Sequence, residues 1–239
     1  MPRILTVVVL FFPERKVAWE GDVLLVDNTN NNIGVATALN KGLKKAIEED
    51  YDWLLTMDQD SEFTPGSFDE LKAIAFSASE DVAIVSPFHL TQKAKVKSGK
   101  RTGEVRFTMT SGSLHRVASC KQVGLFEDKL FIDSVDNEYC LRLRKNGFKV
   151  IQANHAILDH QLGSLSKFNT ITHNAARRYY ITRNMLYVMS KYPGFIAFGT
   201  KELIKAFLLI LLVENDKRSK LRSYFLGVFD FLRGRYGPR

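Results

Sequence analysis

Short apolar runs alternate with amphipathic stretches in the first part of the chain. The runs Ile4–Phe12, Asp22–Val26, Asp52–Met57 and Val82–Ser86 have the length and the flanking polar or turn residues of buried strands. Between the second and third runs, Gly34–Glu49 carries apolar residues at helical spacing, with lysines and glutamates on the other side. Strands that alternate with helices in this way predict an α/β fold with a parallel sheet.

The pattern is less regular after residue 90. Further elements are expected as follows: a helix from Pro65 to Ser77, a loop or edge hairpin over Thr91–Arg106, a short helix after Ser111–Ser113 that reaches Gln122, a helix over Val135–Asn146 closed by Gly147, a strand over Phe148–Gln152, and helices from Thr170 onward. We therefore expect an α/β domain over residues 1–165 and a helical C-terminal appendage over residues 166–239.

Composition agrees with a globular chain. Of the 239 residues, 45% are hydrophobic and 25% are charged, which excludes wholesale disorder. Cys120 and Cys140 lack paired-ligand spacing, which argues against a disulfide scaffold or a zinc site and suits a reducing compartment. The apolar N-terminal run ends at Pro13 without a small-residue cleavage site, so no signal peptide is expected and a cytoplasmic location is favoured.

The net charge of +8 lies mainly in the last part of the chain. Residues 1–186 hold 24 Lys/Arg and 22 Asp/Glu, whereas residues 187–239 hold 10 and 4. The tail is also apolar, but its uncharged run over 206–213 is well short of the ~20 residues that span a bilayer. Two interpretations stay open: a helical hairpin with solvated basic residues, or an interfacial helix on an anionic membrane surface. A near-neutral body without an aromatic-basic sheet motif argues against nucleic-acid binding.

Two carboxylates follow the third predicted strand in Asp58-Gln59-Asp60. Side chains of an extended chain repeat every two residues, so both acids are expected on one side. Ligands of open α/β sheets bind at the carboxyl ends of strands. Paired oxygens there suit Mg²⁺ or Mn²⁺ bound together with substrate phosphates. The alternative is a solvated turn, since Asp and Ser are common turn residues.

Five segments, taken together and in this order, resemble motifs of the family 2 glycosyltransferases, the inverting GT-A type, and of their rhamnosyltransferase-like branch. They are Asn32–Gly42, Asp58–Ser61, Phe131–Arg142, His160–Gly163 and Arg177–Asn184. The resemblance covers about residues 4–190. It implies a GT-A-type fold, that of the nucleotide-diphospho-sugar transferases: a mixed, mostly parallel sheet flanked by helices.

The resemblance also implies roles on the donor side. Asp27 matches the aspartate that contacts the nucleotide base or ribose. Gly34 and Asn40 match the segment under the nucleotide. Asp58 and Asp60 match the metal motif, with Asp60 as the direct ligand and Asp58 also on the donor side.

On the acceptor side, Asp136 matches the general base, and Asp133 is its competitor because it also lies close to that helix start. The alternative is a purely structural role, because acids at a helix N-terminus interact favourably with the helix dipole. Glu138 is expected to orient its neighbours. His160 matches a residue near the metal and the diphosphate, although a lone histidine is usually structural.

Four further residues are candidates for contact with acceptor or phosphate: Ser111, Arg142, Arg177 and Arg183. Each has a structural alternative. Ser111 can cap the next helix, and the arginines can be solvated or paired on helix faces.

The implied activity is a metal-dependent, inverting hexosyl transfer from a nucleotide-diphosphate sugar to a glycan or lipid-linked glycan of a bacterial surface polysaccharide. The branch implies a deoxysugar donor such as dTDP-rhamnose. The apolar, basic tail separately predicts a peripheral position on the inner face of the plasma membrane. A sugar nucleotidyltransferase needs a Gly-rich basic loop after the first strand, which Phe11–Arg15 does not provide.

The chain departs from the family after the first strand. Only ten residues separate Phe12 from Val23, where the family carries a helix. One sheet face then loses its cover, or the C-terminal tail supplies it. This shortening motivates a second hypothesis, a catalytically degenerate GT-A-like module that only binds.

Overall fold

The computed structural model describes residues 1–13, 21–91, 99–159, 164–165 and 171–239. The chain divides into two compact units. The first comprises Met1–Glu127 and Asp136–Gln161, and the second comprises Asp128–Val135 and Leu162–Arg239. The helical unit thus includes a short segment from the middle of the chain, which the sequence analysis assigned to the α/β domain.

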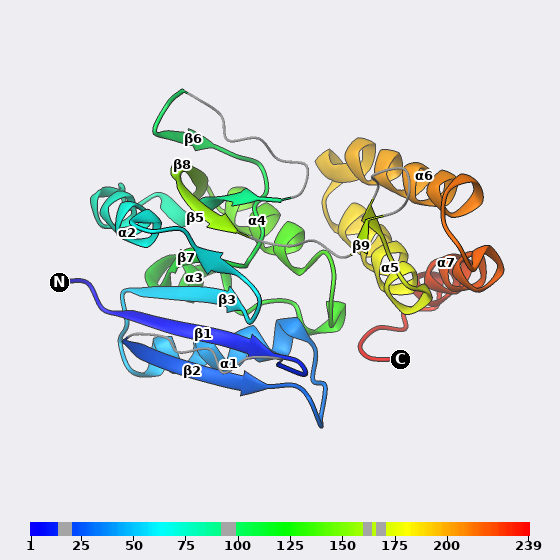
Figure 1. The fold of residues 1–239 in the computed structure, drawn as a ribbon, viewed down its shortest axis with the longest axis horizontal. Coiled ribbons are helices and arrows are strands. Elements are labelled where there is room, and N and C mark those ends of the chain that lie inside the picture. Colours follow the sequence, from blue (N-terminus) through cyan, green and yellow to red (C-terminus); the bar gives the residue numbers. More distant parts are fainter. Residues whose placement is uncertain (14–20, 92–98, 160–163, 166–170) are drawn as a thin grey trace. The chain divides into compact units, whose positions relative to one another are not determined.

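The first unit is built on an eight-stranded mixed sheet (Figure 1). Its path is β2-β1-β3-β7-β5-β8-β4, and β6 pairs with β8 beside that path. The strands are β1 (Ile4–Leu10), β2 (Asp22–Asp27), β3 (Trp53–Asp58), β4 (Glu62–Phe63), β5 (Val82–Leu90), β6 (Thr102–Glu104), β7 (Ser113–Arg116) and β8 (Lys149–Asp159). Strands β2, β1, β3, β5 and β8 run in one direction, which confirms the predicted mixed, mostly parallel sheet.

Strand β7 differs from the expected helix start. It lies antiparallel between β3 and β5, in the middle of the sheet. The sequence hides it because its four residues include only one aliphatic side chain, Leu114. The polar members are buried with partners: Ser113 Oγ donates to Met109 O at 2.7 Å, and His115 Nε2 lies 3.2 Å from Thr56 Oγ1.

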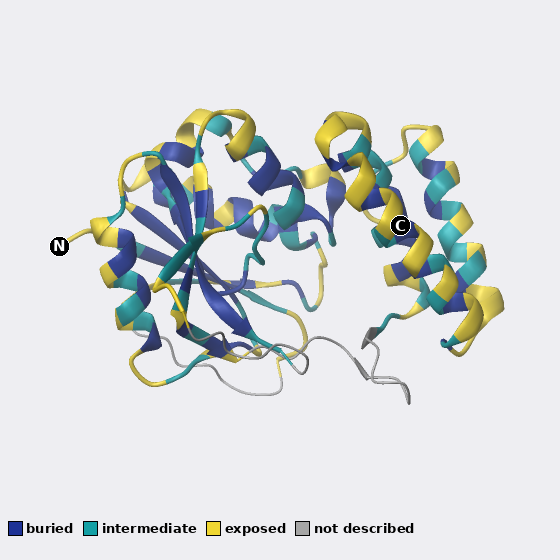
Figure 2. Cartoon of the chain, turned by 90° about the horizontal axis from the view of Figure 1, so that it is seen from above, coloured by how far each residue is buried: buried dark blue, intermediate teal, exposed yellow. Residues whose placement is uncertain are grey.

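Helices cover both faces of the sheet. The predicted helix α1 (Val35–Glu48) is confirmed, and it packs on β1, β2 and β3. Val7 contacts α1, whereas the next residue, Val8, belongs to the core under α2 (Ser67–Ser77). Because neighbouring residues of a strand point to opposite faces, α1 and α2 lie on opposite sides. Figure 2 shows the strands as the buried layer. Helices α3 (Val117–Val123) and α4 (Val135–Lys145) complete this unit.

Gly42 is the point of closest approach between α1 and the sheet. A Cβ atom at this position would lie 2.5 Å from the Cβ of Val7. Gly42→Ala is therefore expected to lower the free energy of unfolding by about 1–3 kcal/mol through overpacking, although alanine favours helix by about 1 kcal/mol. Urea unfolding measures the change.

Gly103→Ala is the matched control, because its added Cβ would meet only Asn154 Nδ2 at 3.9 Å. If Gly42→Ala proved as stable as the wild type and the control, the close approach of α1 to β1 would be contradicted.

The face of the sheet at β2 is partly open. Leu25 is 52% exposed, and only Val26 and Asn28 are buried in and just after the strand. β1 and β2 are adjacent and parallel. Residues 14–20 of their short connection, where the sequence predicts at most a turn of helix, lie outside the described residues.

The second unit is helical. It contains α5 (Ala175–Lys191), α6 (Ile196–Leu212) and α7 (Lys217–Leu232), the 3₁₀ turns η1 (Asp128–Leu130) and η2 (Pro193–Phe195), and the strand pair β9 (Ser164–Leu165) and β10 (Ile171–Thr172). α5 packs against both α7 and α6. A buried carboxylate, Glu214, binds Arg178 and Lys220, the latter at 3.2 Å. None of the described helices has the length and apolar character needed to cross a bilayer.

Candidate functional site

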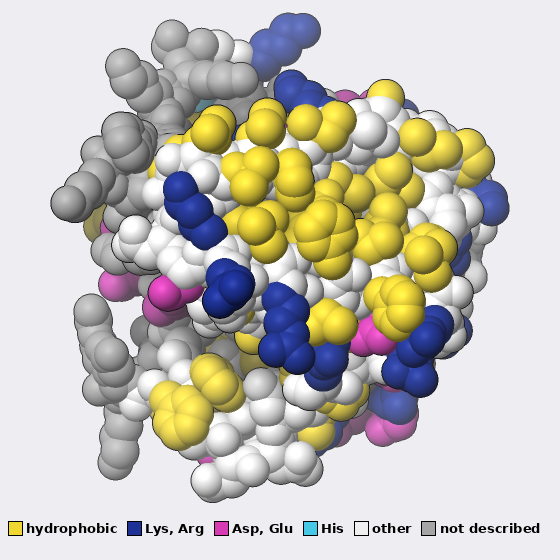
Figure 3. All heavy atoms as spheres, turned by 90° about the vertical axis from the view of Figure 1, so that its right-hand side faces the viewer, with side chains coloured by type: hydrophobic (Ala, Val, Ile, Leu, Met, Phe, Trp, Pro, Cys, Tyr) yellow, Lys and Arg dark blue, Asp and Glu magenta, His cyan; other side chains and the backbone are white. Residues whose placement is uncertain are grey.

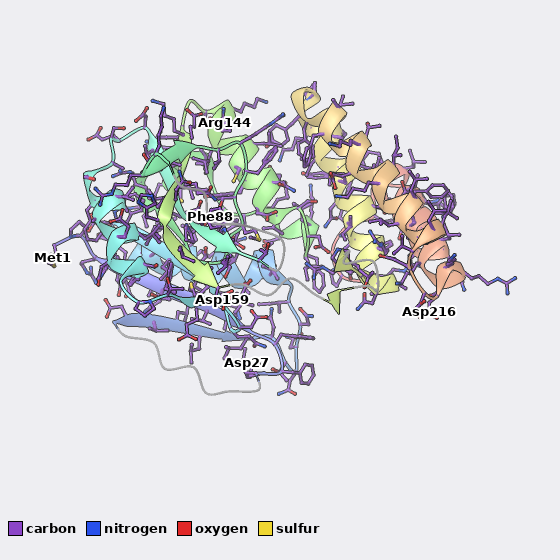
Figure 4. The ribbon with its side chains drawn as sticks, turned by 45° about the horizontal axis from the view of Figure 1, so that its top comes forward. Met1, Asp27, Phe88, Arg144, Asp159 and Asp216 are labelled. Carbon is purple, nitrogen blue, oxygen red and sulfur yellow. The ribbon has the colours of Figure 1, made fainter. Side chains whose placement is uncertain are left out.

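Two acids end the strands on either side of β1. In the sheet register Leu10 pairs with Asp27, the last residue of β2, and Val9 pairs with Asp58, the last residue of β3. Strands lie about 5 Å apart, so the two backbone positions are about 10 Å from each other. Figure 4 labels Asp27 and Asp159, the last residue of β8, at this end of the sheet. The carboxyl ends of these parallel strands therefore lie at one edge of the sheet.

Asp27 is held ionised by a local turn. Its Oδ1 accepts a hydrogen bond from the backbone N–H of Thr29 at 2.7 Å. Hydrogen bonds from the Thr29 hydroxyl and N–H lower the pKa of Asp27 below its ordinary value. The next residue, Asn28, is 2% exposed, and its Oδ1 has no hydrogen-bond partner among the described residues. A buried, unpaired acceptor of this kind is costly unless a ligand supplies a donor.

Two aromatic rings follow β1 beside this turn. Phe11 and Phe12 are 49% and 63% exposed, with ring centroids 4.9 Å apart. Phe12 has a φ of 48°, and its N–H donates to Thr29 Oγ1 at 3.1 Å. No function was predicted for these rings from the sequence. Their only signal there is a Phe-Phe pair directly after a buried strand.

Gln59, between the two acids of the Asp58–Asp60 motif, fastens the motif to the end of β1. Its Oε1 accepts from Phe11 N at 2.7 Å, and its Nε2 donates to Phe11 O at 2.9 Å. Asp58 is half-buried, whereas Asp60 is exposed. The amide clamp thus fixes the backbone from which both carboxylates project.

Ser111 lies behind Asp58 in a buried polar network. Its Oγ accepts from Asp58 N at 3.3 Å and donates to Ser61 Oγ at 2.9 Å. Its carbonyl oxygen lies 2.7 Å from His89 Nε2. The following residue, Gly112, has a φ of 74°, and a Cβ there would lie 2.8 Å from Leu158 Cδ2. Ser111 therefore supports the strand end from within.

The motif at the start of α1 has structural contacts. Gly34 precedes the helix with a φ of 84°, and its N–H donates to Asn32 Oδ1 at 2.9 Å. Asn40 is 3% exposed. Its side-chain amide accepts from Phe126 N at 2.8 Å and donates to Phe126 O at 2.9 Å. Asn40 thereby ties α1 to the loop before α4.

Asp136 lies in the first turn of α4. Its carboxylate is half-buried, with Oδ1 accepting from Asn137 N at 2.8 Å. It borders a small hollow, too narrow to hold a water molecule, that Thr108, Thr110 and His115 also line. Thr110 O accepts a hydrogen bond from Thr56, two residues before Asp58. The segment over 108–111 thus lies between the start of α4 and the end of β3.

His115 is not a competing base in this hollow. Its ring is buried, and burial lowers its pKa to about 3. The neutral ring contacts Thr56 Oγ1 through Nε2 and packs edge-on against Phe126. Asp136 is then the carboxylate that lines this hollow.

Glu138 and Arg142 form an ion pair inside the first unit. Glu138 is fully buried, and its Oε2 accepts from Arg142 Nη2 at 2.6 Å. Arg142 Nη1 also donates to the carbonyl oxygens of Val123 and Leu125, at 3.1 and 2.7 Å. The pair ties α4 to the loop that Asn40 holds, which fits the predicted orienting role of Glu138.

Asp133 lies in the second unit, in contact with Arg177. The Arg177 Nη2–Asp133 Oδ1 distance is 3.1 Å. Burial raises the pKa of Asp133, and the Arg177 guanidinium opposes this rise. Arg177 is itself exposed, and it lies in the first turn of α5.

A strained turn precedes Asp136 in the chain. Phe131, Asp133 and Ser134 have φ values of 64°, 62° and 62°, which are unfavourable for residues other than glycine. Asn184 holds this turn from α5: its Nδ2 lies 2.8, 2.6 and 2.9 Å from the carbonyl oxygens of Leu130, Ile132 and Asp133, respectively. The sequence pattern does not mark Asn184 as the residue that holds this turn.

Arg183, a predicted phosphate or acceptor candidate, lies inside the second unit. It is 1% exposed. Its guanidinium donates to Gly237 O at 2.8 Å and to the carbonyl oxygens of Lys129 and Leu130 at 3.3 Å. It also faces the rings of three tyrosines, Tyr179, Tyr180 and Tyr236, at 5.1–5.8 Å. Arg183 thus binds the chain itself.

Asp58 and Asp60 are suitable ligands for a hard divalent cation. Within the described residues, no group of three or more His, Cys, Asp or Glu side chains is arranged to hold a metal. Two carboxylates at a strand end nevertheless match Mg²⁺ or Mn²⁺, which take oxygen ligands and are commonly completed by substrate phosphates. The predicted third ligand, His160, lies outside the described residues.

The comparison with known families agrees with this geometry. Residues 14–121 match the model of the family described as Glycosyl transferase family 2. This match covers 108 of the 239 residues, and it shows that this part of the chain is similar to family 2 glycosyltransferases. The chain is also similar to the dTDP-rhamnosyl transferase RfbF of Shigella flexneri, at 25% identity over an alignment 229 positions long that covers 85% of this chain and 76% of that protein. Both matches agree with the resemblance to rhamnosyltransferase-like family 2 glycosyltransferases.

Comparison with solved structures shows that this chain has the fold of GT-A glycosyltransferases. The mannosyltransferase PcManGT from Pyrobaculum calidifontis, in complex with GDP-Man and Mn²⁺, matches 98% of this chain and 88% of its own, with a TM-score of 0.56 and 11% identity. TarS 1-349 of S. aureus, in complex with UDP-GlcNAc, matches 98% and 81%, with a TM-score of 0.55 and 12% identity. At these identities the likeness establishes the fold alone.

Proposed function

We propose that this chain transfers a sugar from a nucleoside-diphosphate donor to an acceptor hydroxyl with inversion. The observation that carries the proposal is the position of Asp27 and Asp58 at the carboxyl ends of the two parallel strands on either side of β1. Asp136 adds a carboxylate at the start of α4, beside the segment that borders β3. No protein nucleophile is required, because one attack from the face opposite the diphosphate completes the reaction.

The end of β2 would bind the nucleoside. The unpaired Asn28 Oδ1 and the ionised Asp27 are hydrogen-bond acceptors, which suits the imide N–H of a pyrimidine base and the ribose hydroxyls. The exposed rings of Phe11 and Phe12 offer a stacking surface beside them. A thymine or uracil nucleotide fits this set, and the similarity to RfbF favours dTDP-rhamnose.

Asp58 and Asp60 would hold Mg²⁺ or Mn²⁺ against the donor diphosphate. The cation, when bound, supplies Lewis-acid stabilisation of the phosphate charge. Gln59 fixes the backbone between the two carboxylates through both of its hydrogen bonds to Phe11. His160 stays a proposed ligand from the resemblance alone.

Asp136 would remove the proton from the acceptor hydroxyl. A carboxylate at the start of α4 has the chemistry of a general base once an acceptor hydroxyl lies beside it. The proposed acceptor is a glycan or lipid-linked glycan of a bacterial surface polysaccharide. The exposed Arg177, next to Asp133, is the proposed contact for its phosphate or polar groups.

Turnover with defined donors tests the proposal. The purified chain is incubated with dTDP-rhamnose, with UDP- and GDP-sugars, and with a glycan acceptor extract plus Mn²⁺, and release of nucleoside diphosphate is measured. Preferential release from dTDP-rhamnose supports the proposal. Calorimetry with a panel of nucleotides and Mn²⁺ separates the alternatives: absence of all nucleotide binding contradicts the transferase and favours the degenerate module, which would bind glycan or a protein partner.

Removal of the cation is expected to abolish transfer. With EDTA, release of nucleoside diphosphate should fall to background, and added Mn²⁺ or Mg²⁺ should restore it. Asp60→Asn should raise the Mn²⁺ concentration for half-maximal activity by about 10-fold or more, since it removes a charged oxygen ligand.

Asp50→Asn is the matched control for this change, because Asp50 is an exposed acid before the opposite end of β3. Full activity in EDTA after extensive dialysis would contradict the metal dependence.

A further inference from the structure

An apolar face runs over α6 and α7 of the second unit. It comprises exposed side chains that share one surface: Ile196, Ile204, Leu208, Leu211 and Leu212 of α6, and Phe225, Phe229 and Leu232 of α7. Figure 3 shows this gathering of hydrophobic side chains on one side of the molecule. Single exposed hydrophobic residues are ordinary in proteins, but a contiguous patch marks an interaction surface.

Helical spacing makes the face continuous. On α6, Ile204, Leu208 and Leu212 follow each other at four-residue intervals and therefore lie along one side. On α7, Phe225 and Phe229 have the same spacing. Phe207 of α6 joins the two rows, since its ring centroid lies 6.2 Å from that of Phe225.

Basic side chains border the apolar face. On α6, the exposed Lys201 and Lys205 each lie three residues before an apolar residue of the face, Ile204 and Leu208. On α7, the exposed Arg218 and Arg222 extend the row of Phe225 and Phe229 toward the N-terminus of the helix. The Arg233 guanidinium lies 4.0 Å from the centroid of the Phe229 ring. Figure 3 shows Lys and Arg side chains along the lower margin of the patch. Residues 196–239 hold nine Lys/Arg against four Asp/Glu.

A basic hollow adjoins this border at the start of α7. The pocket, of about 1120 Å³, is lined by Lys217, Arg218, Lys220 and Arg222, together with residues at the start of α5. One acid, Asp216, also lines the pocket, and the nearby Glu214 is paired with Arg178 and Lys220. The hollow therefore carries an excess of positive charge next to the apolar last turn of α6.

We propose that this face docks on an anionic lipid bilayer. The leucine, isoleucine and phenylalanine side chains enter the boundary between headgroups and acyl chains, while the bordering arginines and lysines contact lipid phosphates. Charge complementarity selects this occupant over a second copy of the chain, because two copies joined through the face would oppose their basic borders. The apolar area also distinguishes the face from a site for a soluble anion.

Sedimentation with vesicles tests the proposal. The full chain is mixed with phosphatidylcholine vesicles that contain phosphatidylglycerol, and with vesicles of phosphatidylcholine alone. Binding is expected only to the anionic vesicles, and it should weaken as salt is added. Arg218→Gln with Arg222→Gln should lower the partition coefficient by about fivefold per charge. Phe225→Ser with Phe229→Ser should remove binding at every salt concentration.

The matched controls change similar residues elsewhere. Leu25→Ser with Phe76→Ser removes exposed apolar side chains of the first unit, and Lys41→Gln with Lys44→Gln removes exposed charges of α1. Neither control should alter sedimentation. The proposal is overturned if the full chain stays in the supernatant with anionic vesicles at low salt, or if the controls lose binding as strongly as the tested variants. It is also overturned if the chain is a dimer that the Phe225/Phe229 variant makes monomeric. Vesicle binding is measured without substrates, so its result is independent of glycosyl transfer.

Discussion

Asp136→Asn is expected to lower kcat by about 10²–10⁴-fold and to leave the Kd for nucleotide and Mn²⁺ unchanged. The amide keeps the size of the side chain and its contact with Asn137 N, but it cannot accept the acceptor's proton. Measurement of both quantities on one preparation separates a chemical defect from a binding defect. The loss is expected at saturating donor and acceptor.

Two further variants make this result specific. Asp69→Asn changes an exposed acid in the first turn of α2, as Asp136 lies in the first turn of α4, and should retain full activity. Asp133→Asn tests the competing base. If Asp133→Asn lost activity on this scale while Asp136→Asn retained it, the roles assigned to the two acids would be reversed.

The second large effect is expected from Asn184→Leu. The substitution conserves approximate size but removes the Nδ2 group that contacts three carbonyl oxygens of the turn before Asp136. Leu130 O keeps Arg183 Nη2 and Ile132 N as donors, whereas the carbonyl oxygens of Ile132 and Asp133 lose the donor from Asn184. A buried carbonyl group left without a donor costs about 1–3 kcal/mol, and the left-handed residues Phe131, Asp133 and Ser134 lose their support. We expect the helical unit to lose about 3 kcal/mol or more of its unfolding free energy. Urea unfolding with hydrogen exchange of residues 130–134 measures it.

Asn146→Leu is the control for this substitution. Asn146 is exposed at the end of α4 and donates one hydrogen bond, to Arg142 O at 2.8 Å. It should change the stability by less than about 1 kcal/mol. Equal stability of the Asn184 and Asn146 variants would contradict the role of Asn184 as the holder of the turn.

The elements that the sequence predicted best have strong local signals. The buried strands at Ile4 and Trp53 are apolar runs between polar stops, and α1 has a clear apolar side. The strand at Ser113 has no such signal, because its burial depends on β3 and β5, which lie far away in the sequence. Tertiary context, rather than propensity, makes it a strand.

The same distinction applies to the candidate site. The position of Asp27 and Asp58 at one edge follows from the direction of parallel strands, so the sequence could predict it. The clamp between Gln59 and Phe11 could not be predicted, since it joins residues 48 positions apart. Charged residues also look alike in a sequence: Arg177 is exposed beside an acid, whereas Arg183, six positions later, is buried among carbonyl oxygens.

The central place of β7 has a consequence for synthesis of the chain. While the polypeptide emerges from the N-terminus, β1, β2 and β3 can pair before β7 exists. The edge of β3 then keeps unpaired N–H and C=O groups until residues 113–116 arrive, and β5 must wait for the same four residues. Because such late, long-range pairing slows folding and leaves strand edges open to other chains, the half-made sheet is the species most prone to aggregate.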